Sequence, residues 1–347
     1  MSTRTWWPAL MLSALLAACG GSGSHETTTR TARPITARVR AAAPRPPRTA
    51  PPAPQALVTA ETENRLLVVD LPSGHVAKRI AVARDPEDIA ANSGACSSVV
   101  AVSAAAGKVT VLDRETLNPR RVIGGFKSPH IPEIAPGGQY AYVTDDARGT
   151  VTVIALGTPR VTSTIQVGAD AHHLSFDPER QLAWVALGES ARTIVILSTA
   201  DQAHPRVIGR FDPGFAAHDV SFAPGGRRAW ITSANGSDVT VVGAIDHRPL
   251  FRVPVGRGPQ HVAFAGRYAY LTSGYGATIE KADAATGRIL ARARSPYGSF
   301  ELAAGDGYVV VSSLLRGTLA IYTPGLKLIR VVRLAPATRE VAVSPPA

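Results

Sequence analysis

The sequence is poor in groups for covalent and redox chemistry. Only two of its 347 residues are Cys, and only 6% are aromatic. Two cysteines cannot build a disulfide framework, and there is neither a C-x-x-C pair for zinc nor the C-x-x-C-H motif that attaches haem. The G-x-S-x-G nucleophile elbow and the G-x-x-x-x-G-K-[ST] phosphate loop are absent as well. These absences exclude a disulfide scaffold, a c-type haem protein and a P-loop hydrolase, so packing must stabilise the fold.

Long hydrophobic runs are also lacking. The apolar stretch from Trp6 to Leu16 contains Pro8 and is shorter than the roughly 20 residues of a membrane-spanning helix. It has the length of the hydrophobic region of a secretory signal. It ends in Leu16-Ala17-Ala18-Cys19-Gly20, which resembles the bacterial lipobox, where cleavage precedes a Cys that is then acylated. The resemblance implies a lipoprotein signal peptide at residues 1–18, lipidation of Cys19 and a lipid anchor on the extracytoplasmic face of the cell membrane. The alternative is an ordinary secretory signal with an incidental Cys.

Acidic residues are scarce in the next segment. Residues 20–55 contain six Arg, one acid (Glu26) and many Gly, Ser, Thr and Pro, and carry +5 of the formal net charge of +11. Because few of these residues could build a core, residues 19–55 are predicted to be a lipidated Cys followed by a disordered tether. Its expected partners are anionic lipid headgroups and cell-wall polymers, and the other interpretation is a plain soluble spacer. Nucleic acid is not an expected partner, because no aromatic side chains alternate with the arginines.

The rest of the sequence is a repeat. From residue 56 onward, runs of alternating Val, Ile, Thr and Tyr are separated by Gly-rich turns, which is typical of antiparallel strands. An aromatic residue, or an aliphatic one in its place, recurs every 40–46 residues, at Leu57, Ala101, Tyr142, Trp184, Trp230, Tyr270 and Val310. A period of this length with several strands per unit indicates a β-propeller. The predicted fold is therefore all-β, with one propeller over residues 56–347.

The two ends of the repeat region complement each other. Residues Arg339 to Ser344 have the pattern of the first, inner strand of a unit, and no further strands follow them. Residues 57–82 supply the remaining strands of such a unit and lack an opening strand. Pairing the C-terminal strand with the N-terminal blade closes the ring and predicts seven blades. Six or eight blades are the alternatives if a faint repeat, around residues 85–124 or 298–334, is misread.

One unit carries a family resemblance. Tyr142-Val143-Thr144-Asp145 follows a Pro-Gly-Gly turn and precedes Gly149-Thr150-Val151-Thr152-Val153, with degenerate copies at 230–233 and 270–273. These strings resemble the YVTN repeat of seven-bladed propellers in bacterial exported and surface proteins, here in a lipoprotein form. The resemblance implies the fold of residues 56–347. It implies no single activity, because related propellers range from binding scaffolds to redox enzymes.

Candidate site residues follow from the fold, since propeller sites lie at the mouth of the channel, where the inner strands begin. Aligning the units there gives a first column of Glu87, His130, His172, His218, Gln260, Ser299 and Arg339. The next position gives a second column of Asp88, Ile131, His173, Asp219, His261, Phe300 and Glu340. Side chains alternate along a strand, so the two columns are not expected to face the channel together.

Five of the nine His fall in these columns, which indicates a ligand site. Neutral imidazoles from neighbouring strands can bind Zn or Cu, with carboxylates as further ligands or as hydrogen-bond partners. The expected metal ligands are His130, His172 and His218. Further candidates at the mouth are His173, His261, Asp88, Asp219 and Glu340. The competing interpretation, which the repeat favours, is structural, with imidazoles bonding backbone groups between blades.

The predicted function is binding at the cell envelope. A lipid-anchored, monomeric propeller would present its loops and polar channel mouth to a cell-wall polymer, an envelope protein or a small ligand, without catalysis. Zn or Cu is the only cofactor that the pattern suggests. The alternatives are a metal-dependent enzyme of the lactonase or lyase type and a redox accessory protein, either using the His cluster. The acidic pair Asp145-Asp146 is interpreted as a solvated turn rather than a Ca²⁺ site.

Overall fold

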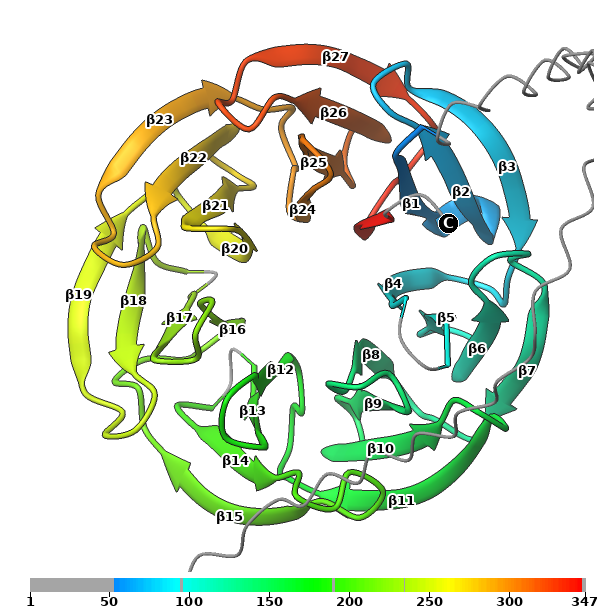
Figure 1. Cartoon of the computed structure of the whole chain (residues 1–347), viewed down its shortest axis with the longest axis vertical. Coiled ribbons are helices and arrows are strands. Elements are labelled where there is room, and N and C mark those ends of the chain that lie inside the picture. Colours follow the sequence, from blue (N-terminus) through cyan, green and yellow to red (C-terminus); the bar gives the residue numbers. More distant parts are fainter. Residues whose placement is uncertain (1–52, 94–95, 189–190, 234, 345–347) are drawn as a thin grey trace, which may run out of the picture. The chain divides into compact units, whose positions relative to one another are not determined.

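The computed structural model describes residues 53–93, 96–188, 191–233 and 235–344. The predicted signal peptide, the lipidation of Cys19 and nearly all of the tether lie outside the described residues. Within them the chain forms 28 strands and one short 3-10 helix, η1 (Glu61–Glu63), and no helix there could cross a bilayer. The strands make seven antiparallel four-stranded sheets, or blades, around a central channel (Figure 1). The prediction of an all-β, seven-bladed propeller is confirmed.

The strands of each blade follow one another from the inner strand at the channel to the outer strand at the rim (Figure 1). Blade 1 contains β28 (Val341–Ser344), β1 (Gln55–Ala60), β2 (Arg65–Asp70) and β3 (His75–Ala81). Blade 2 contains β4 (Pro86–Ala91), β5 (Ser98–Ser103), β6 (Lys108–Asp113) and β7 (Pro119–Gly124). Blade 3 contains β8 (Pro129–Ile134), β9 (Tyr140–Asp145), β10 (Thr150–Ala155) and β11 (Arg160–Gln166).

The other blades repeat this order. Blade 4 contains β12 (Leu174–Asp177), β13 (Leu182–Ala186), β14 (Ile194–Ser198) and β15 (Arg206–Phe211). Blade 5 contains β16 (Val220–Phe222), β17 (Arg228–Ile231), β18 (Asp238–Gly243) and β19 (Pro249–Pro254). Blade 6 contains β20 (Pro259–Ala265), β21 (Tyr268–Ser273), β22 (Thr278–Asp283) and β23 (Ile289–Arg294). Blade 7 contains β24 (Leu302–Gly305), β25 (Tyr308–Ser313), β26 (Thr318–Tyr322) and β27 (Leu328–Arg333).

Blade 1 closes the ring as the sequence predicts. Strand β28 pairs antiparallel with β1, in a register that runs from Gln55↔Ser344 to Val58↔Val341. Just beyond this pairing, the Glu340 amide donates to the Thr59 hydroxyl at 2.8 Å. The first and last described strands thus share one sheet, which leaves no open edge between the ends of the ring.

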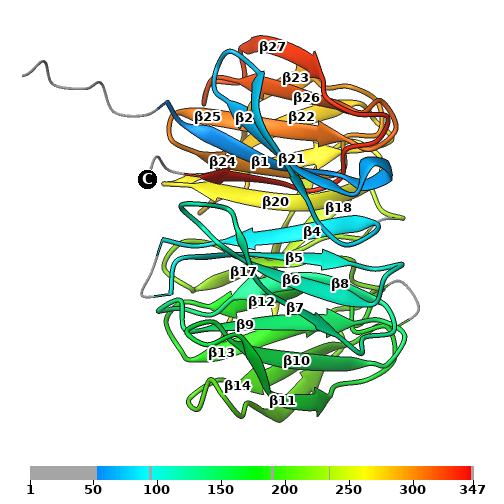
Figure 2. The same cartoon turned by 90° about the vertical axis from the view of Figure 1, so that its right-hand side faces the viewer.

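The core lies between neighbouring blades. The repeat aromatics Tyr142, Trp184, Trp230 and Tyr270 are at most 1% exposed. Trp184 of blade 4, for example, packs in one cluster with Val220 and other apolar residues of blade 5. Figure 2 shows the propeller from the side, with the strands running between its two faces. A blade therefore buries its faces only against its neighbours, which explains why the repeat extends around the whole ring.

A buried hydroxyl links each of several repeats to the next. The Thr144 hydroxyl accepts from the Ile131 amide of its own blade at 3.0 Å and donates to the His172 carbonyl of the next blade at 2.7 Å. The equivalent hydroxyls of Thr59, Thr232, Thr272 and Ser312 donate to the carbonyls of Glu87, Gln260, Phe300 and Arg339. These accepting residues stand at the start of the inner strands, so the hydroxyls fix the backbone around the channel mouth.

Candidate metal centre

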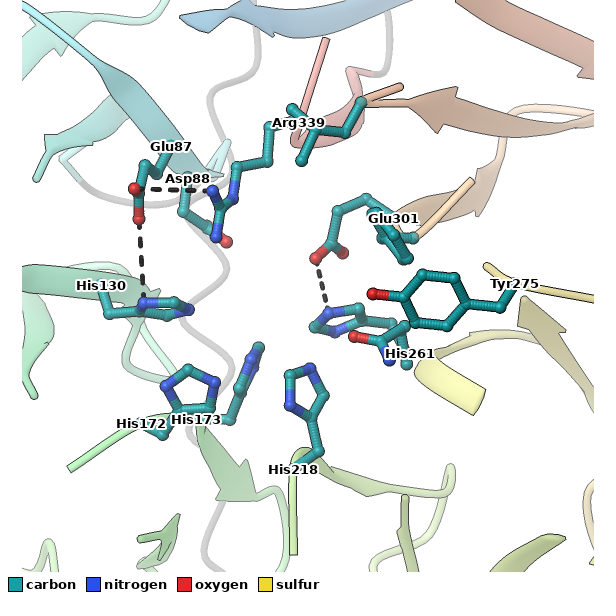
Figure 3. A pocket seen from close by; sticks show the side chains of 13 residues that line it. Glu87, Asp88, His130, His172, His173, His218, His261, Tyr275, Glu301 and Arg339 are labelled. Atoms are coloured by element: carbon teal, nitrogen blue, oxygen red, sulfur yellow. Dashed lines mark ion pairs between the residues drawn. The ribbon is translucent and has the colours of Figure 1, made fainter. Parts of the chain in front are cut away.

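The leading ends of the inner strands enclose a cavity of about 220 Å³ at one end of the channel (Figure 3). Ten members of the two predicted columns line it: Glu87, Asp88, His130, His172, His173, His218, Gln260, His261, Phe300 and Arg339. Tyr275, Glu301 and Leu314 complete the lining. Asp219 and Glu340 line a second cavity of about 150 Å³ farther along the channel.

Five imidazoles meet in the first cavity. The ring centroids of His130 and His172 lie 4.1 Å apart, and those of His172 and His173 lie 4.7 Å apart. The His173 ring is also 4.9 Å from the His218 ring and 4.6 Å from the His261 ring. The expectation that the two columns cannot face the channel together is therefore wrong, because the sequence neighbours His172 and His173 both join the cluster.

Strand alternation fails here because the inner strands begin irregularly. The His172 amide donates to the Ala186 carbonyl at 3.0 Å, and the Ala186 amide donates to the His173 carbonyl at 2.8 Å. His172 and His173 thus both lie opposite the single residue Ala186, as in a β-bulge. A bulge of this kind turns successive side chains toward the same side of the strand. The register of β8 shifts between Pro129 and Pro132, around His130. The register of β20 shifts in the same way around His261.

Asp146 orients two of the imidazoles. Its Oδ2 lies 3.1 Å from His172 Nδ1 and 3.3 Å from His130 Nδ1. Burial raises the pKa of Asp146, but the hydrogen bonds from His130 and His172 outweigh burial and lower this pKa to about 2. An ionised carboxylate only accepts, so both Nδ1 atoms carry a proton and direct it at Asp146.

The interpretation of Asp145-Asp146 as a solvated turn is therefore wrong. The Asp146 side chain is only 24% exposed and contacts the imidazoles. Asp145 is fully buried and accepts from the backbone amides of Lys127 and Ser128 at 2.8 and 3.0 Å. Asp146 thus contacts the imidazoles at the channel mouth, and the Asp145 carboxylate holds the loop before β8.

His261 has a different electrostatic environment from the other four imidazoles. Its Nδ1 lies 3.6 Å from Asp219, and its Nε2 lies 2.5 Å from Glu301. Burial lowers the pKa of His261, but the negative charges of Glu301 and Asp219 outweigh burial and raise this pKa to about 10. His261 is therefore a cation at neutral pH, and with both ring nitrogens protonated it has no lone pair for a metal.

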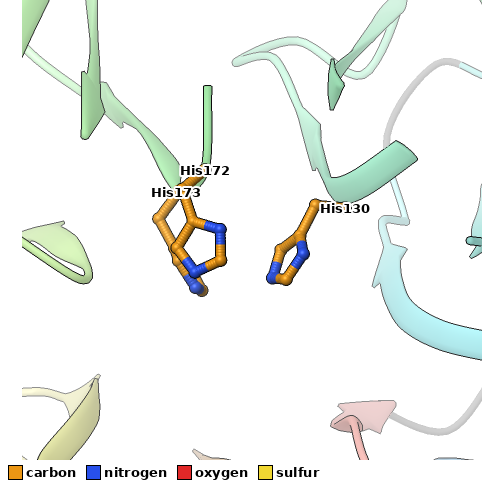
Figure 4. A group of neighbouring side chains, drawn as sticks. All are labelled: His130, His172 and His173. Carbon is orange, nitrogen blue, oxygen red and sulfur yellow. The ribbon is translucent and has the colours of Figure 1, made fainter. Parts of the chain in front are cut away.

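Two groups of three His place one nitrogen each within 4.8 Å of the others. They are His130 with His172 and His173, and His173 with His218 and His261. The expected set of His130, His172 and His218 is not among the groups found within the described residues. The first group is the better metal centre (Figure 4), because the second contains the cationic His261.

Burial favours the neutral form of two rings of the first group, His130 and His173. Burial lowers the pKa of His130, and burial together with the charge of His261 lowers that of His173 further. The His173 Nδ1 faces Asp219 at 3.5 Å, so the same carboxylate–imidazole arrangement recurs on the third ring. Tetrahedral zinc with Zn–N bonds of about 2.0–2.1 Å holds its nitrogens about 3.4 Å apart. One nitrogen of each ring in the first group lies within 4.8 Å of the others.

His218 lies beside this group and is available as a fourth ligand. Its ring centroid is 5.0 Å from that of His172. Its Nδ1 is buried without a hydrogen-bond partner among the described residues, and burial lowers the pKa of the ring. An unpaired buried nitrogen is costly unless something binds it.

A layer of carboxyl groups lies next to the imidazoles. Asp88, Glu301 and Glu340 place one oxygen each within 4.8 Å of the others. Burial and the negative charges of the neighbouring carboxylates raise the pKa of Asp88 and of Glu340 well above their usual ranges. Burial, with Asp219 adding to it, raises the pKa of Glu133 to about 8. The predicted candidates Asp88 and Glu340 thus belong to this carboxyl layer rather than to the imidazole group.

The sequence alignment missed Glu301 because it placed blade 7 one residue too early. The Thr272 hydroxyl donates to the Phe300 carbonyl as Thr144 does to His172, so Phe300, not Ser299, occupies the first column and Glu301 the second. The distance from the repeat aromatic to the first column is 30 residues from Tyr142 to His172 but 29 from Val310 to Arg339, so counting along the sequence could not decide between Ser299 and Phe300. Glu133 and Tyr275 lie outside both columns, so nothing in the repeat singled them out.

Comparisons with known proteins support the fold. The chain matches no family description and no curated protein sequence. It is similar in structure to a functionally unknown protein from Desulfotomaculum acetoxidans DSM 771, with a TM-score of 0.73 and 17% identity over 84% of this chain and 99% of that one. Hydrazine synthase from Kuenenia stuttgartiensis gives a TM-score of 0.66 and 15% identity over 80% of this chain and 97% of that one. Apo AztD from Citrobacter koseri gives a TM-score of 0.65 and 11% identity over 85% of this chain and 98% of that one. At these identities the likeness concerns the propeller fold alone.

Proposed function

We propose that this propeller is a metal-binding protein that holds one divalent transition-metal ion on His130, His172 and His173. The observation that carries the proposal is the carboxylate contact on each of the three imidazoles. Asp146 accepts from the Nδ1 atoms of two rings and Asp219 faces that of the third, which leaves the Nε2 atoms for a metal. Carboxylate partners of this kind orient histidine ligands and increase their basicity.

The donor set favours zinc or copper. Neutral imidazole suits Zn, Cu and Ni, whereas Mg²⁺ and Ca²⁺ prefer oxygen ligands. Three imidazoles leave one position of a tetrahedral zinc ion for His218 or for a ligand from the cavity. Zn²⁺ is accordingly the probe of choice.

We also propose where the protein acts. Export and acylation of Cys19 would anchor it on the extracytoplasmic face of the cell membrane, with the basic tether near anionic headgroups and wall polymers. The support is the lipobox-like string and the charge of residues 20–55. Cys19→Ala should release the protein from the membrane fraction, and unchanged membrane retention would refute the anchor.

Metal binding is tested on protein purified without an affinity tag. We expect one equivalent of Zn²⁺ per chain by elemental analysis, and at least a hundredfold loss of affinity in His173→Ala, which removes the shared ligand. His204→Ala is the matched control, because His204 pairs with Asp201 at 3.2 Å but is 66% exposed. Substoichiometric Zn²⁺ in the wild type, or equal affinities of the two variants, would contradict the proposal.

A further inference from the structure

Apart from the imidazoles, the cavity is lined by hydrogen-bond donors that the protein itself leaves unsatisfied. Among the described residues, the Tyr275 hydroxyl and the Gln260 carboxamide have no hydrogen-bond partner, although Gln260 is only 8% exposed. The Arg339 guanidinium lies 3.5 Å from Glu87 and 3.7 Å from Glu61. These distances exceed the 2.7–2.9 Å of a charge-assisted hydrogen bond, so Arg339 also keeps donors for a ligand.

Two of the three carboxyl groups that line the same cavity already have a basic partner. Glu301 contacts His261 Nε2 at 2.5 Å, and Glu87 lies 3.5 Å from Arg339. The third, Asp88, belongs to the carboxyl layer with Glu340. Figure 3 shows Arg339 and Tyr275 extending toward the cavity that the imidazoles border. An anion entering there would meet the free donors of Arg339, Tyr275 and Gln260, and a metal ion would add to the attraction.

The cavity limits the size and polarity of that anion. Its volume of about 220 Å³ is below the range of sites for drug-sized ligands. At about 30 Å³ per water molecule, it holds the volume of about seven waters. Phe300, Leu314 and the Tyr275 ring, whose centroid lies 5.3 Å from that of Phe300, give it an apolar side. The best fit is a compact anion with a short apolar part.

We propose that the metal-loaded site binds a small organic carboxylate, one oxygen of which ligates the metal while the other accepts from the Arg339, Tyr275 and Gln260 donors. This inference rests on the proposed metal binding and specifies the fourth ligand of the ion. It makes the protein a receptor for a metal–carboxylate pair rather than for a bare ion. The short apolar part of the carboxylate would lie against Phe300 and Leu314.

The test uses the full chain loaded with Co²⁺, whose visible absorption bands report the ligands of the ion. Titration with butyrate should change the bands and saturate, and phosphate, which lacks an apolar part, should bind at least tenfold more weakly. Arg339→Gln should raise the half-saturating butyrate concentration about 10- to 100-fold, as expected for a hydrogen bond to a charged group. Tyr275→Phe should raise it about 3- to 10-fold.

The matched control is Tyr297→Phe. Tyr297 is exposed like Tyr275, at 44% against 50%, but does not line the cavity, so this variant should titrate like the wild type. Bound Co²⁺ with bands that butyrate leaves unchanged would overturn the inference and leave metal binding intact. Equal binding of phosphate and butyrate, or wild-type titration of Arg339→Gln, would also overturn it. Failure to take up Co²⁺ or Zn²⁺ would instead overturn the proposed function.

Discussion

Asp146→Asn tests the role of the carboxylate that orients two metal ligands. The substitution keeps the size of the side chain but removes its charge. Asp146 Oδ2 accepts from His172 Nδ1 at 3.1 Å and from His130 Nδ1 at 3.3 Å. Both rings contact this one oxygen, so the carboxamide oxygen of Asn can take its place and still accept from both, but without the negative charge. We therefore expect both hydrogen bonds to become weaker rather than one to be lost.

The magnitude follows from the lost charge. Hydrogen bonds to charged groups contribute about 1.5–3 kcal/mol against about 0.5–1.5 kcal/mol for neutral ones, so two bonds weakened by about 1 kcal/mol each correspond to about a 10- to 100-fold weaker Zn²⁺ affinity. The same range is typical when a hydrogen-bond partner of a metal-ligating His is removed. The affinity is measured at pH 7 by competition with a chromogenic chelator, and circular dichroism checks that the variant is folded.

The control is Asp201→Asn. Asp201 pairs with His204 Nδ1 at 3.2 Å, so the chemistry of the substitution is the same, but both side chains are 66% exposed. This variant should keep the wild-type Zn²⁺ affinity. A folded Asp146→Asn variant that binds Zn²⁺ within twofold of the wild type would contradict this role of the carboxylate.

Three further predictions concern the ring. Thr144→Val leaves the buried Ile131 amide and His172 carbonyl without their hydroxyl partner, so the free energy of unfolding should fall by about 1–3 kcal/mol in urea titrations; an unchanged midpoint would contradict the linking role. Ending the chain at residue 340 removes β28 and exposes the edge of β1, so cooperative thermal unfolding should be lost or shifted far downward, whereas wild-type melting would argue against closure through blade 1. Burial raises the pKa of Tyr322, whose hydroxyl donates to the Arg294 carbonyl at 2.8 Å, to about 12. In the unfolded chain the phenol ionises at about pH 10. Burial of the neutral Tyr322 phenol therefore stabilises the fold fully below that pH, and this contribution is lost as pH rises toward 12. Tyr322→Phe should therefore lose less stability than the wild type between pH 9.5 and 11.5, and parallel pH profiles would contradict the assignment.

The fold could be predicted because each repeat in the sequence corresponds to one blade of the propeller. The aromatic position that Trp184 and Trp230 occupy is buried between blades, so each unit needs the same kind of residue there. Blade 1 needs an inner strand that the N-terminal segment does not supply, so residues Arg339 to Ser344 could be predicted to pair with the N-terminal strands. Only the exact bounds of β28 differ from that prediction. These are consequences of packing and chain closure, which sequence patterns reflect well.

The site could be predicted only in part. The columns gave all five His of the cluster, because their positions repeat. They did not give the orientation of the side chains, because β-bulges at the start of the inner strands override the alternation that separated His172 from His173. They also could not give the protonated state of His261, which depends on Glu301 and Asp219 from neighbouring blades. Asp146 stood next to an equally plausible acid, Asp145, and only its contacts distinguish the two.

The central claim is that the three imidazoles of His130, His172 and His173 form a metal site at the channel mouth. X-ray absorption spectroscopy at the zinc edge of the Zn²⁺-loaded full chain tests it most directly. We expect one zinc per chain with at least three imidazole nitrogens at about 2.0–2.1 Å, and fewer imidazoles in His173→Ala. A zinc ion surrounded mainly by oxygen, or a spectrum that His173→Ala leaves unchanged, would contradict it.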